Sequence, residues 1–337
     1  MRDFKSEQEV LQYYEETKHR VVIFEGTVYD VDSYISQHPG GQEFLVNYLG
    51  KVIDEPFEEH GHTNSARLIF RDLDKVGYIF GETQHQGSDL SKANIKGLDG
   101  LQLKSTIKID YNRGLYKQML DANLSWDDYI TFINEPKHLV NPIRDIKVFD
   151  NWFLELFTKT PWWGIPMAFG PIFYYHFSQV EADWLTFIAF ILIGTISWQF
   201  TEYILHRFLF HSEDYWLPNH PLVLAHHFIL HGIHHAYPMD RYRLVMPIAP
   251  GYFIYFFVTA PYKLLMSDYY YHPQICGLLI GYVAYDLIHY FLHHSSPKDG
   301  YFKSLKTYHM QHHYKNGQLG FGVSMKFWDY VFFTQID

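Results

Sequence analysis

Four long apolar stretches lie between residues 160 and 285 of a chain that is otherwise largely polar. They cover residues 160–180, 184–201, 244–262 and 269–285, and charged residues flank each of them. A helix needs roughly 20 apolar residues to cross the hydrocarbon core of a bilayer, and each stretch approaches that length. Short polar turns at 181–183 and 263–268 join them in two pairs. The pattern predicts two transmembrane helical hairpins, in preference to four buried helices of a soluble protein.

Residues 1–85 have the mixed pattern of a small soluble α+β domain. Apolar runs at 21–24 and 28–31 flank Glu25-Gly26-Thr27, which predicts two short strands around a turn. Helical patterns follow at 42–49 and 65–71.

A composition rich in Gly, Ser, Asp and Lys predicts a linker over residues 86–109. The rest of the chain, 110–337, forms the second predicted domain. It begins with polar and aromatic residues up to 159, which favour amphipathic elements near a membrane.

Composition excludes some classes of function. The formal net charge of −10 disfavours a nucleic-acid partner, because phosphate binding needs a basic surface. The mean hydropathy of −0.19 averages a polar part and an apolar part. Cys276 is the single cysteine, so no disulfide framework exists, as expected for parts that face the cytosol. The polar start MRDFKSEQEV resembles no cleaved leader, so we expect internal segments to enter the membrane.

Basic residues predict the orientation of the hairpins. The two hairpin turns carry only Lys263, whereas residues 205–243 and the tail after 295 carry Arg207, Arg241, Arg243, Lys298, Lys303, Lys306, Lys315 and Lys326. Because basic loops stay in the cytosol, the N-terminal domain, the middle segment and the tail are expected on the cytosolic side.

Histidines dominate the candidate chemistry: 15 of the 22 lie between His206 and His313. Four clusters contain His206 and His211; His231, His234 and His235; His289 and His293; and His309, His312 and His313. Positions i, i+3 and i+4 share one face of a helix, so the last three clusters should each project two or three imidazoles in one direction. His206 and His211 are about 140° apart on a regular helix, so they flank the site or the helix ends there.

Ten imidazoles exceed the ligand capacity of one metal ion, and two ions are the smallest number that uses them all. No Glu-x-x-His pair of the carboxylate-bridged di-iron type occurs among the clusters, which favours an all-nitrogen site. Asp286 and Glu202, each one turn from a cluster, either orient ligands or are ordinary helix-end carboxylates. The neighbouring His220, His226, His227 and His294 are expected to be supporting or independently satisfied residues, and His272 falls on the opposite side of the membrane.

The N-terminal domain contains a candidate haem site. In His38-Pro39-Gly40-Gly41 the Pro and Gly residues allow a tight turn that presents the histidine. His62 lies 24 residues later, before an apolar helix, and two facing histidines suit a six-coordinate haem that transfers electrons. His60 is the rival for the second ligand; the spacing favours His62.

These motifs resemble known families. VVIFEGTVYDV, HPGG and HGHTNSARLIF resemble a cytochrome b5 domain, and EYILHRFLFH, HGIHHAYPMD, DLIHYFLHH and YHMQHHY resemble the fatty acid hydroxylase superfamily. Their fusion, with LYKQML and LFTKTPWW between them, is similar to the fatty acid 2-hydroxylases. The resemblance implies that His38 and His62 bind haem b. It implies ten metal ligands: His206, His211, His231, His234, His235, His289, His293, His309, His312 and His313.

The resemblance also implies a fold and a reaction. The expected fold is an α+β cytochrome b5-like haem domain, then an all-α integral membrane domain with four transmembrane helices and a cytosolic histidine-rich helical cap. The expected reaction is O2-dependent 2-hydroxylation of long or very-long-chain fatty acyl groups for sphingolipid or ceramide synthesis. The expected location is the endoplasmic reticulum membrane, and the electron donor is of the cytochrome b5 reductase type. Its basic face would meet the acidic run Asp54, Glu55, Glu58 and Glu59.

Two iron ions are expected in the working enzyme, because O2 activation needs a redox-active metal and zinc has no redox chemistry; zinc remains possible in a purified sample. The residues leave three alternatives open. They are a desaturase with a fused haem domain, a sterol or methyl-sterol oxidase, and a non-enzymatic membrane haem carrier whose histidines store metal.

Overall fold

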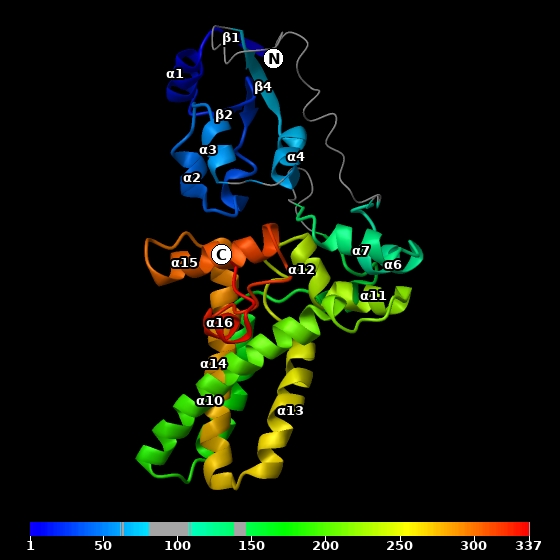
Figure 1. Cartoon of the computed structure of the whole chain (residues 1–337), viewed down its shortest axis with the longest axis vertical. Helices are drawn as coiled ribbons and strands as arrows, with labels where there is room; N and C mark the ends of the chain where they lie inside the picture. The colour runs from blue at the N-terminus through cyan, green and yellow to red at the C-terminus, as the bar shows by residue number, and fades with distance from the viewer. Residues whose placement is uncertain (61, 63, 81–106, 108, 138–145, 337) are drawn as a thin grey trace. The chain divides into compact units, whose positions relative to one another are not determined.

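The computed structural model describes residues 1–60, 62, 64–80, 107, 109–137 and 146–336. Figure 1 labels the helices and strands along the chain. The chain separates into two compact units: one holds Met1–Thr106 with Glu135–Arg144, and the other holds Ile107–Asn134 with Asp145–Asp337. Each unit is described by itself. The predicted linker at 86–109 lies outside the described residues, apart from 107 and 109.

The N-terminal unit contains a four-stranded sheet with the strand order β1-β4-β3-β2. β1 pairs with β4 in parallel, and the other pairs are antiparallel. The elements are β1 (Arg2–Phe4), α1 (Glu7–Thr17), β2 (Val21–Phe24), β3 (Thr27–Asp30), the short 3₁₀ helix η1 (Ile35–Gln37), α2 (Gln42–Val46), α3 (Asp54–Glu59), α4 (Asn64–Asp72) and β4 (Lys75–Ile79).

The predicted strand pair in this unit is confirmed. Glu25 and Gly26 connect β2 to β3 with φ of 47° and 73°. Two successive positive φ values are typical of the type I′ turn, whose twist matches that of paired strands. The predicted helices at 42–49 and 65–71 correspond to α2, which is shorter, and to α4. The predicted α+β class of this domain is therefore correct.

The C-terminal unit is helical throughout its described part. Its elements are α6 (Leu115–Asp121), α7 (Trp126–Ile133), α8 (Trp152–Leu156), α9 (Gly164–Ser178), α10 (Trp184–Leu205), η2 (His206–Phe210), η3 (Ser212–Asp214), α11 (Pro221–His227), η4 (Phe228–Gly232), α12 (Ile233–Ala236), α13 (Ile248–Leu265), α14 (Asp268–His294), α15 (Tyr301–Tyr314) and α16 (Phe327–Phe332).

The four apolar stretches form two helical hairpins, α9–α10 and α13–α14, as predicted. In Figure 1 both hairpin turns lie at one end of this unit, and α12 and α15 lie at the other. Two helices are long and apolar enough to span a membrane, Trp184–Phe210 and Asp268–His294. At 1.5 Å per residue, the 15 residues of α9 reach only about 22 Å, short of a bilayer core of roughly 30 Å. Length and composition therefore support two spans, and the prediction of four is not confirmed.

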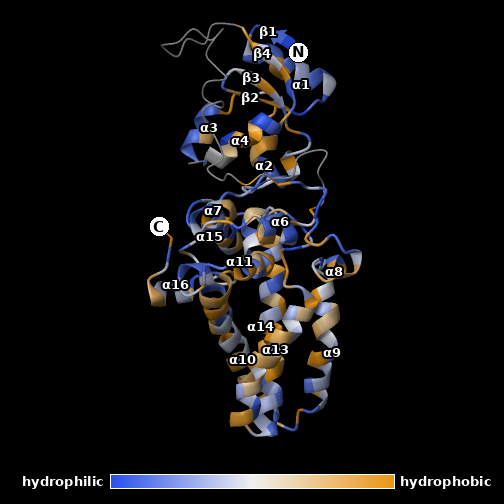
Figure 2. Ribbon diagram, turned by 90° about the vertical axis from the view of Figure 1, so that its right-hand side faces the viewer, coloured by the Kyte–Doolittle hydropathy of each residue, from blue (hydrophilic) through white to orange (hydrophobic). Residues whose placement is uncertain are grey.

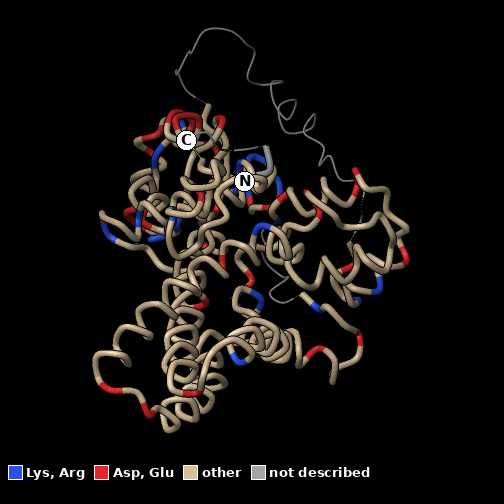
Figure 3. The backbone as a smooth tube through the Cα atoms, turned by 60° about the horizontal axis from the view of Figure 1, so that its bottom comes forward, with Lys and Arg blue, Asp and Glu red and all other residues tan. Residues whose placement is uncertain are grey.

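The outer surface of the hairpins is apolar. Figure 2 shows hydrophobic residues along the long helices, and Figure 3 shows that charged residues are sparse there. Large exposed side chains include Leu192, Ile193 and Ile196 on α10 and Phe253, Phe256 and Phe257 on α13. An apolar surface of this extent is typical of contact with lipid or with another protein.

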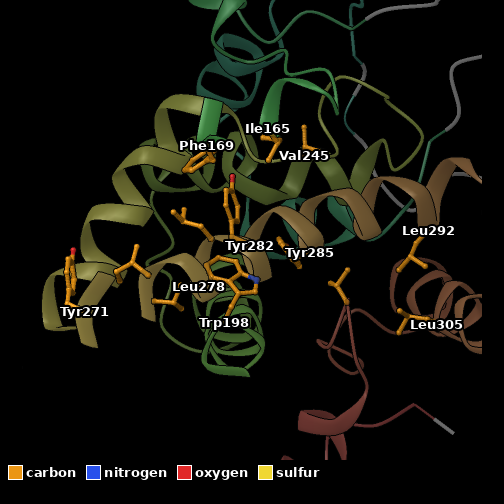
Figure 4. Packing of buried hydrophobic residues seen from close by; sticks show 13 residues of the cluster. Ile165, Phe169, Trp198, Val245, Tyr271, Leu278, Tyr282, Tyr285, Leu292 and Leu305 are labelled. Carbon is orange, nitrogen blue, oxygen red and sulfur yellow. The ribbon is translucent and has the colours of Figure 1, made fainter. Parts of the chain in front are cut away.

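The core of the C-terminal unit forms where α10 crosses α14. Gly194 and Gly277 allow this close approach, because a Cβ on Gly194 would lie 2.3 Å from the Gln274 carbonyl. Aromatic rings fill the neighbouring space: the Trp198 and Tyr282 centroids are 5.0 Å apart, as Figure 4 shows in place. The tight crossing fixes the C-terminal ends of α10 and α14, where their histidines lie, relative to each other.

Candidate metal centre

The ten predicted histidines lie together in two groups, and all ten are buried. Within each group the ring nitrogens lie within 4.8 Å of one another. The first group contains His206, His211, His231, His235 and His312; the second contains His234, His289, His293, His309 and His313. The groups adjoin, since the His235 and His313 ring centroids are 4.3 Å apart.

Two imidazoles of each of the last three sequence clusters enter the same group, as predicted: His231 with His235, His289 with His293, and His309 with His313. His234 and His235 are adjacent on α12 yet belong to different groups, and so do His312 and His313 on α15. A helix turns by about 100° per residue, so neighbouring side chains diverge, whereas residues four apart stay on one face. Each of these two helices therefore supplies both groups.

A π-helix explains how His206 and His211 reach the same group. η2 is a π-helical turn in which the His211 amide donates to the His206 carbonyl at 3.0 Å. Hydrogen bonding to the fifth residue back widens the turn and stacks positions that a regular α-helix would separate. The ring centroids of the two histidines are consequently 5.1 Å apart.

The positions of the ring nitrogens suit metal ligation better than hydrogen bonding between the imidazoles. His309 Nε2 lies 2.9 Å from His293 Nε2 and 3.1 Å from His313 Nε2, and His211 Nε2 lies 3.1 Å from His312 Nε2. A neutral imidazole has one proton for two nitrogens, so several lone pairs must converge here. Further buried ring nitrogens have no hydrogen-bond partner in the described structure: His231 Nε2, His234 Nδ1 and Nε2, His235 Nε2 and His289 Nε2. Leaving such groups unpaired is costly, and a metal ion in each group would satisfy them.

Burial favours the neutral form of four of these imidazoles. Desolvation, followed by the neighbouring rings, lowers the pKa of His231, His234 and His235 well below the usual value. The same causes lower the pKa of His312 to about 3. Neutral imidazole is the form that binds metal, so the pocket favours the protonation state that ligation needs.

A short loop between α15 and α16 orients two rings of the first group. The carbonyls of Phe321 and Leu319 accept hydrogen bonds from Nδ1 of His206 (2.6 Å) and Nδ1 of His312 (2.7 Å). Because each Nδ1 carries the proton, each Nε2 presents its lone pair to the group. Asp329 fixes the loop by accepting from the Phe321 amide at 2.9 Å.

The two carboxylates proposed as ligand-orienting groups have other partners. Glu202 accepts from the amides of Val323 and Ser324 at 2.9 and 2.8 Å, so it anchors the loop. Asp286 accepts from the Met246 amide at 3.3 Å.

Sequence reasoning missed Glu213, the carboxylate that does contact a histidine of the site. Its Oε1 accepts from His211 Nδ1 at 3.0 Å, and its Oε2 lies 2.7 Å from His227 Nε2. The other ring nitrogen of His227 is hydrogen-bonded to the Tyr129 hydroxyl. Burial alone would raise the pKa of Glu213, but His211 and His227 hold it below its usual range. Only the two-residue spacing from His211 could have indicated this role.

An apolar pocket lies between the hairpin helices, and none of the described residues that line it is a histidine. At one end its wall includes Phe210, stacked on His231 of the first group with ring centroids 5.2 Å apart. Tyr285, also in the wall, stacks on His289 of the second group at 6.0 Å. The other lining residues are Phe169, Trp198, Glu202, Leu205, Met246, Gly251, Ile254, Tyr255, Val258, Thr259, Leu278, Leu279 and Tyr282.

In the N-terminal unit, the two predicted haem ligands face each other. The ring centroids of His38 and His62 are 6.2 Å apart. Nδ1 of His38 donates to the Gly41 carbonyl at 2.9 Å and Nδ1 of His62 to the Phe57 carbonyl at 2.8 Å, so both rings are oriented by backbone carbonyls. The rival His60 also donates through Nδ1, to Pro56 at 2.8 Å, and its ring packs beside Phe44.

Two family models match the chain. The model of the fatty acid hydroxylases covers residues 191–334, and the model of the cytochrome b5-like haem/steroid binding domain covers residues 6–106. The first match includes all ten clustered histidines, and the second includes His38 and His62.

Several characterised proteins are similar over most of their length. The ceramide very long chain fatty acid hydroxylase of Saccharomyces cerevisiae is 38% identical, with 92% of this chain and 88% of that protein covered. The fatty acid 2-hydroxylase of Mus musculus is 29% identical, with 92% and 89% covered. A solved structure of full-length scs7p, in which only the hydroxylase domain is visible, matches 68% of this chain and 86% of that chain with a TM-score of 0.62 and 43% identity.

Replacing Glu213 by Gln should weaken metal binding in the first group. The amide keeps the shape but loses the charge that supports His211, and loss of such a supporting contact typically lowers metal affinity by about 10- to 100-fold. Metal content of the purified protein after dialysis against a weak chelator measures the effect. Asp214→Asn is the control, because Asp214 accepts from the Gln318 side chain. Equal metal retention in both variants would contradict the role given to Glu213.

Proposed function

The chain belongs to the fatty acid hydroxylase family as a fatty acid 2-hydroxylase with a cytochrome b5-like domain, and we propose that its ten clustered histidines hold two metal ions. The reaction is O2-dependent hydroxylation at C2 of a long or very long fatty acyl chain for sphingolipid synthesis. The substrate therefore needs an apolar site for its tail and a metal site beside its carboxyl end.

One observation carries the proposal: the wall of a single apolar pocket includes two rings that stack on histidines, one in each group. Phe210 stacks on His231 and Tyr285 stacks on His289, so one ring separates a chain in the pocket from each group. The pocket wall is formed mainly by aliphatic and aromatic side chains, which suit an acyl tail and exclude water. This arrangement supports reaction near one end of a long apolar substrate.

Each of the two proposed ions would have one group of five histidines as its candidate ligands. When bound, a pair of redox-active ions supplies the oxidising power that an unactivated C–H bond requires, and we propose iron because zinc lacks redox chemistry. The chain favours the neutral form of four of these imidazoles by burial, fixes the ring orientation of His206 and His312 through backbone carbonyls, and holds His211 through Glu213.

His38 and His62 are proposed to hold a haem b, which when bound would supply one-electron transfer for O2 reduction. Within the acidic run near this site, Asp54 accepts from the Glu25 amide at 2.7 Å, and Glu58 is paired with Arg67. Glu55 and Glu59 are exposed on α3, so these two carboxylates are proposed to meet the basic face of a cytochrome b5 reductase-type donor.

The protein is a membrane protein, and we propose that both hairpins enter the bilayer of the endoplasmic reticulum. The short helices α9 and α13 would then accompany the two longer spans, giving four membrane helices. The excess of basic residues on the side away from the hairpin turns supports a cytosolic metal centre and a cytosolic N-terminal domain.

His312→Ala should abolish 2-hydroxylation while the haem spectrum stays intact. The variant removes a ligand of the first group and frees the Leu319 carbonyl, but it leaves the N-terminal unit unchanged. Membranes incubated with a long fatty acid and NADH, followed by mass spectrometry of the products, test this. His226→Ala is the control, because that exposed ring lies outside both histidine groups, bonds to the Leu222 carbonyl and packs against Tyr116. Unchanged hydroxylation in His312→Ala, or a double bond as the wild-type product, would contradict the proposal.

His62→Ala should lose the haem absorbance and NADH-driven hydroxylation while retaining the metal ions. The matched variant His60→Ala should keep all three properties, because only His62 is proposed as the second axial ligand. The opposite outcome, haem loss in His60→Ala alone, would reassign the ligand.

A further inference from the structure

A buried polar cluster joins three of the hairpin helices at a distance from both histidine groups. His176 on α9 is hydrogen-bonded through Nε2 to the Tyr255 hydroxyl on α13 at 2.8 Å. Its Nδ1 lies 3.0 Å from Nδ1 of His272 on α14. His176 and His272 are only 3% and 7% exposed, so the cluster is enclosed by the helices. The sequence pattern had placed His272 on the far side of the membrane but gave it no role.

The cluster adjoins the end of the apolar pocket that lies away from the histidine groups. Along α13 the pocket wall extends from Gly251 to Thr259, about 12 Å at the rise of an α-helix. Tyr255, Val258 and Thr259 form the part of that wall nearest the hairpin turn. Tyr255 therefore belongs to both features, with its ring in the pocket wall and its hydroxyl in the polar cluster.

We propose that the Tyr255–His176–His272 cluster forms the fixed end of the acyl pocket and so sets the length of chain that the enzyme accepts. The inference rests on the proposed function, because it takes the occupant of the pocket to be the acyl tail of the substrate. The commitment to an acyl tail comes from the apolar wall and from the contacts of that wall with histidines of both groups.

Hydrogen bonds make Tyr255 a rigid stop. His176 is buried, so moving the partly buried Tyr255 ring aside would leave His176 Nε2 without the bond to the Tyr255 hydroxyl, which is unfavourable. His176 is itself held by His272, and the two contacts tie α13 to α9 and α9 to α14. The Thr259 hydroxyl donates to the Tyr255 carbonyl at 2.8 Å, so it presents no free polar group to the pocket. An acyl chain would therefore touch the apolar ring of Tyr255, while the polar groups of the cluster lie behind that ring.

The test is a competition between a long and a very long saturated acyl substrate. The full-length protein is expressed in cells that lack their own 2-hydroxylase, and the ratio of very long to long 2-hydroxylated products is measured. Tyr255→Ala opens the end of the pocket and should raise that ratio about tenfold, since differences of one methylene in an apolar pocket change specificity by at least that factor. Phe256→Ala is the matched control, because Phe256 is the next residue on α13 but is 63% exposed.

Two further variants test separately the hydrogen bond of Tyr255 and the space at the end of the pocket. Tyr255→Phe keeps the ring but loses the bond to His176, so it should raise the ratio less than Tyr255→Ala. Val258→Trp fills the same end of the pocket and should lower the ratio, which tests the inference even where Tyr255→Ala fails to fold.

An unchanged ratio in both Tyr255→Ala and Val258→Trp, or an equal rise in Phe256→Ala, would overturn the proposed stop. Absence of 2-hydroxylated product from the wild type would instead refute the proposed function. Haem and metal content of each variant, measured on the purified full chain, shows whether it is folded.

Discussion

Ten imidazoles buried in two contiguous groups impose the constraint on which the C-terminal unit depends. Burial lowers the pKa of His309, and lone pairs converge at distances such as the 2.9 Å between the Nε2 atoms of His293 and His309. A cation bound in each group would satisfy the lone pairs that converge there. The tight crossing of α10 and α14, the π-helical turn η2 and the loop held by Asp329 all keep these rings close together. The contacts that pack the helices together therefore also position the histidine rings.

Much of this arrangement could be predicted from the sequence. Apolar length and flanking charge gave the two hairpins, and the turn at Glu25-Gly26 gave the first strand pair of the N-terminal domain. Histidine spacing selected ten residues, and all ten lie in the two groups. These features are local, since periodicity and turn chemistry act over a few residues.

The features that the sequence did not predict depend mainly on contacts between distant segments. The division of His234 from His235 requires the positions of α10, α14 and α15 around α12, which spacing alone does not contain. The widening of η2 is a local departure from α-helical geometry that the pattern of residues does not report. His176 lies inside an apolar stretch, and its partner His272 is 96 residues away in the sequence, so spacing does not predict their contact. The helix α9, Gly164–Ser178, is also shorter than the apolar stretch 160–180 from which it was expected.

The number of metal ions per chain tests the central claim most directly. Metal content and haem content can be measured on the same sample of full-length protein, by mass spectrometry of the elements and by absorbance. Two ions per haem are expected in the wild type, and one in each of His234→Ala and His235→Ala, because those adjacent residues belong to different groups. A single ion in the wild type, or the loss of both ions in only one of the two variants, would contradict the account.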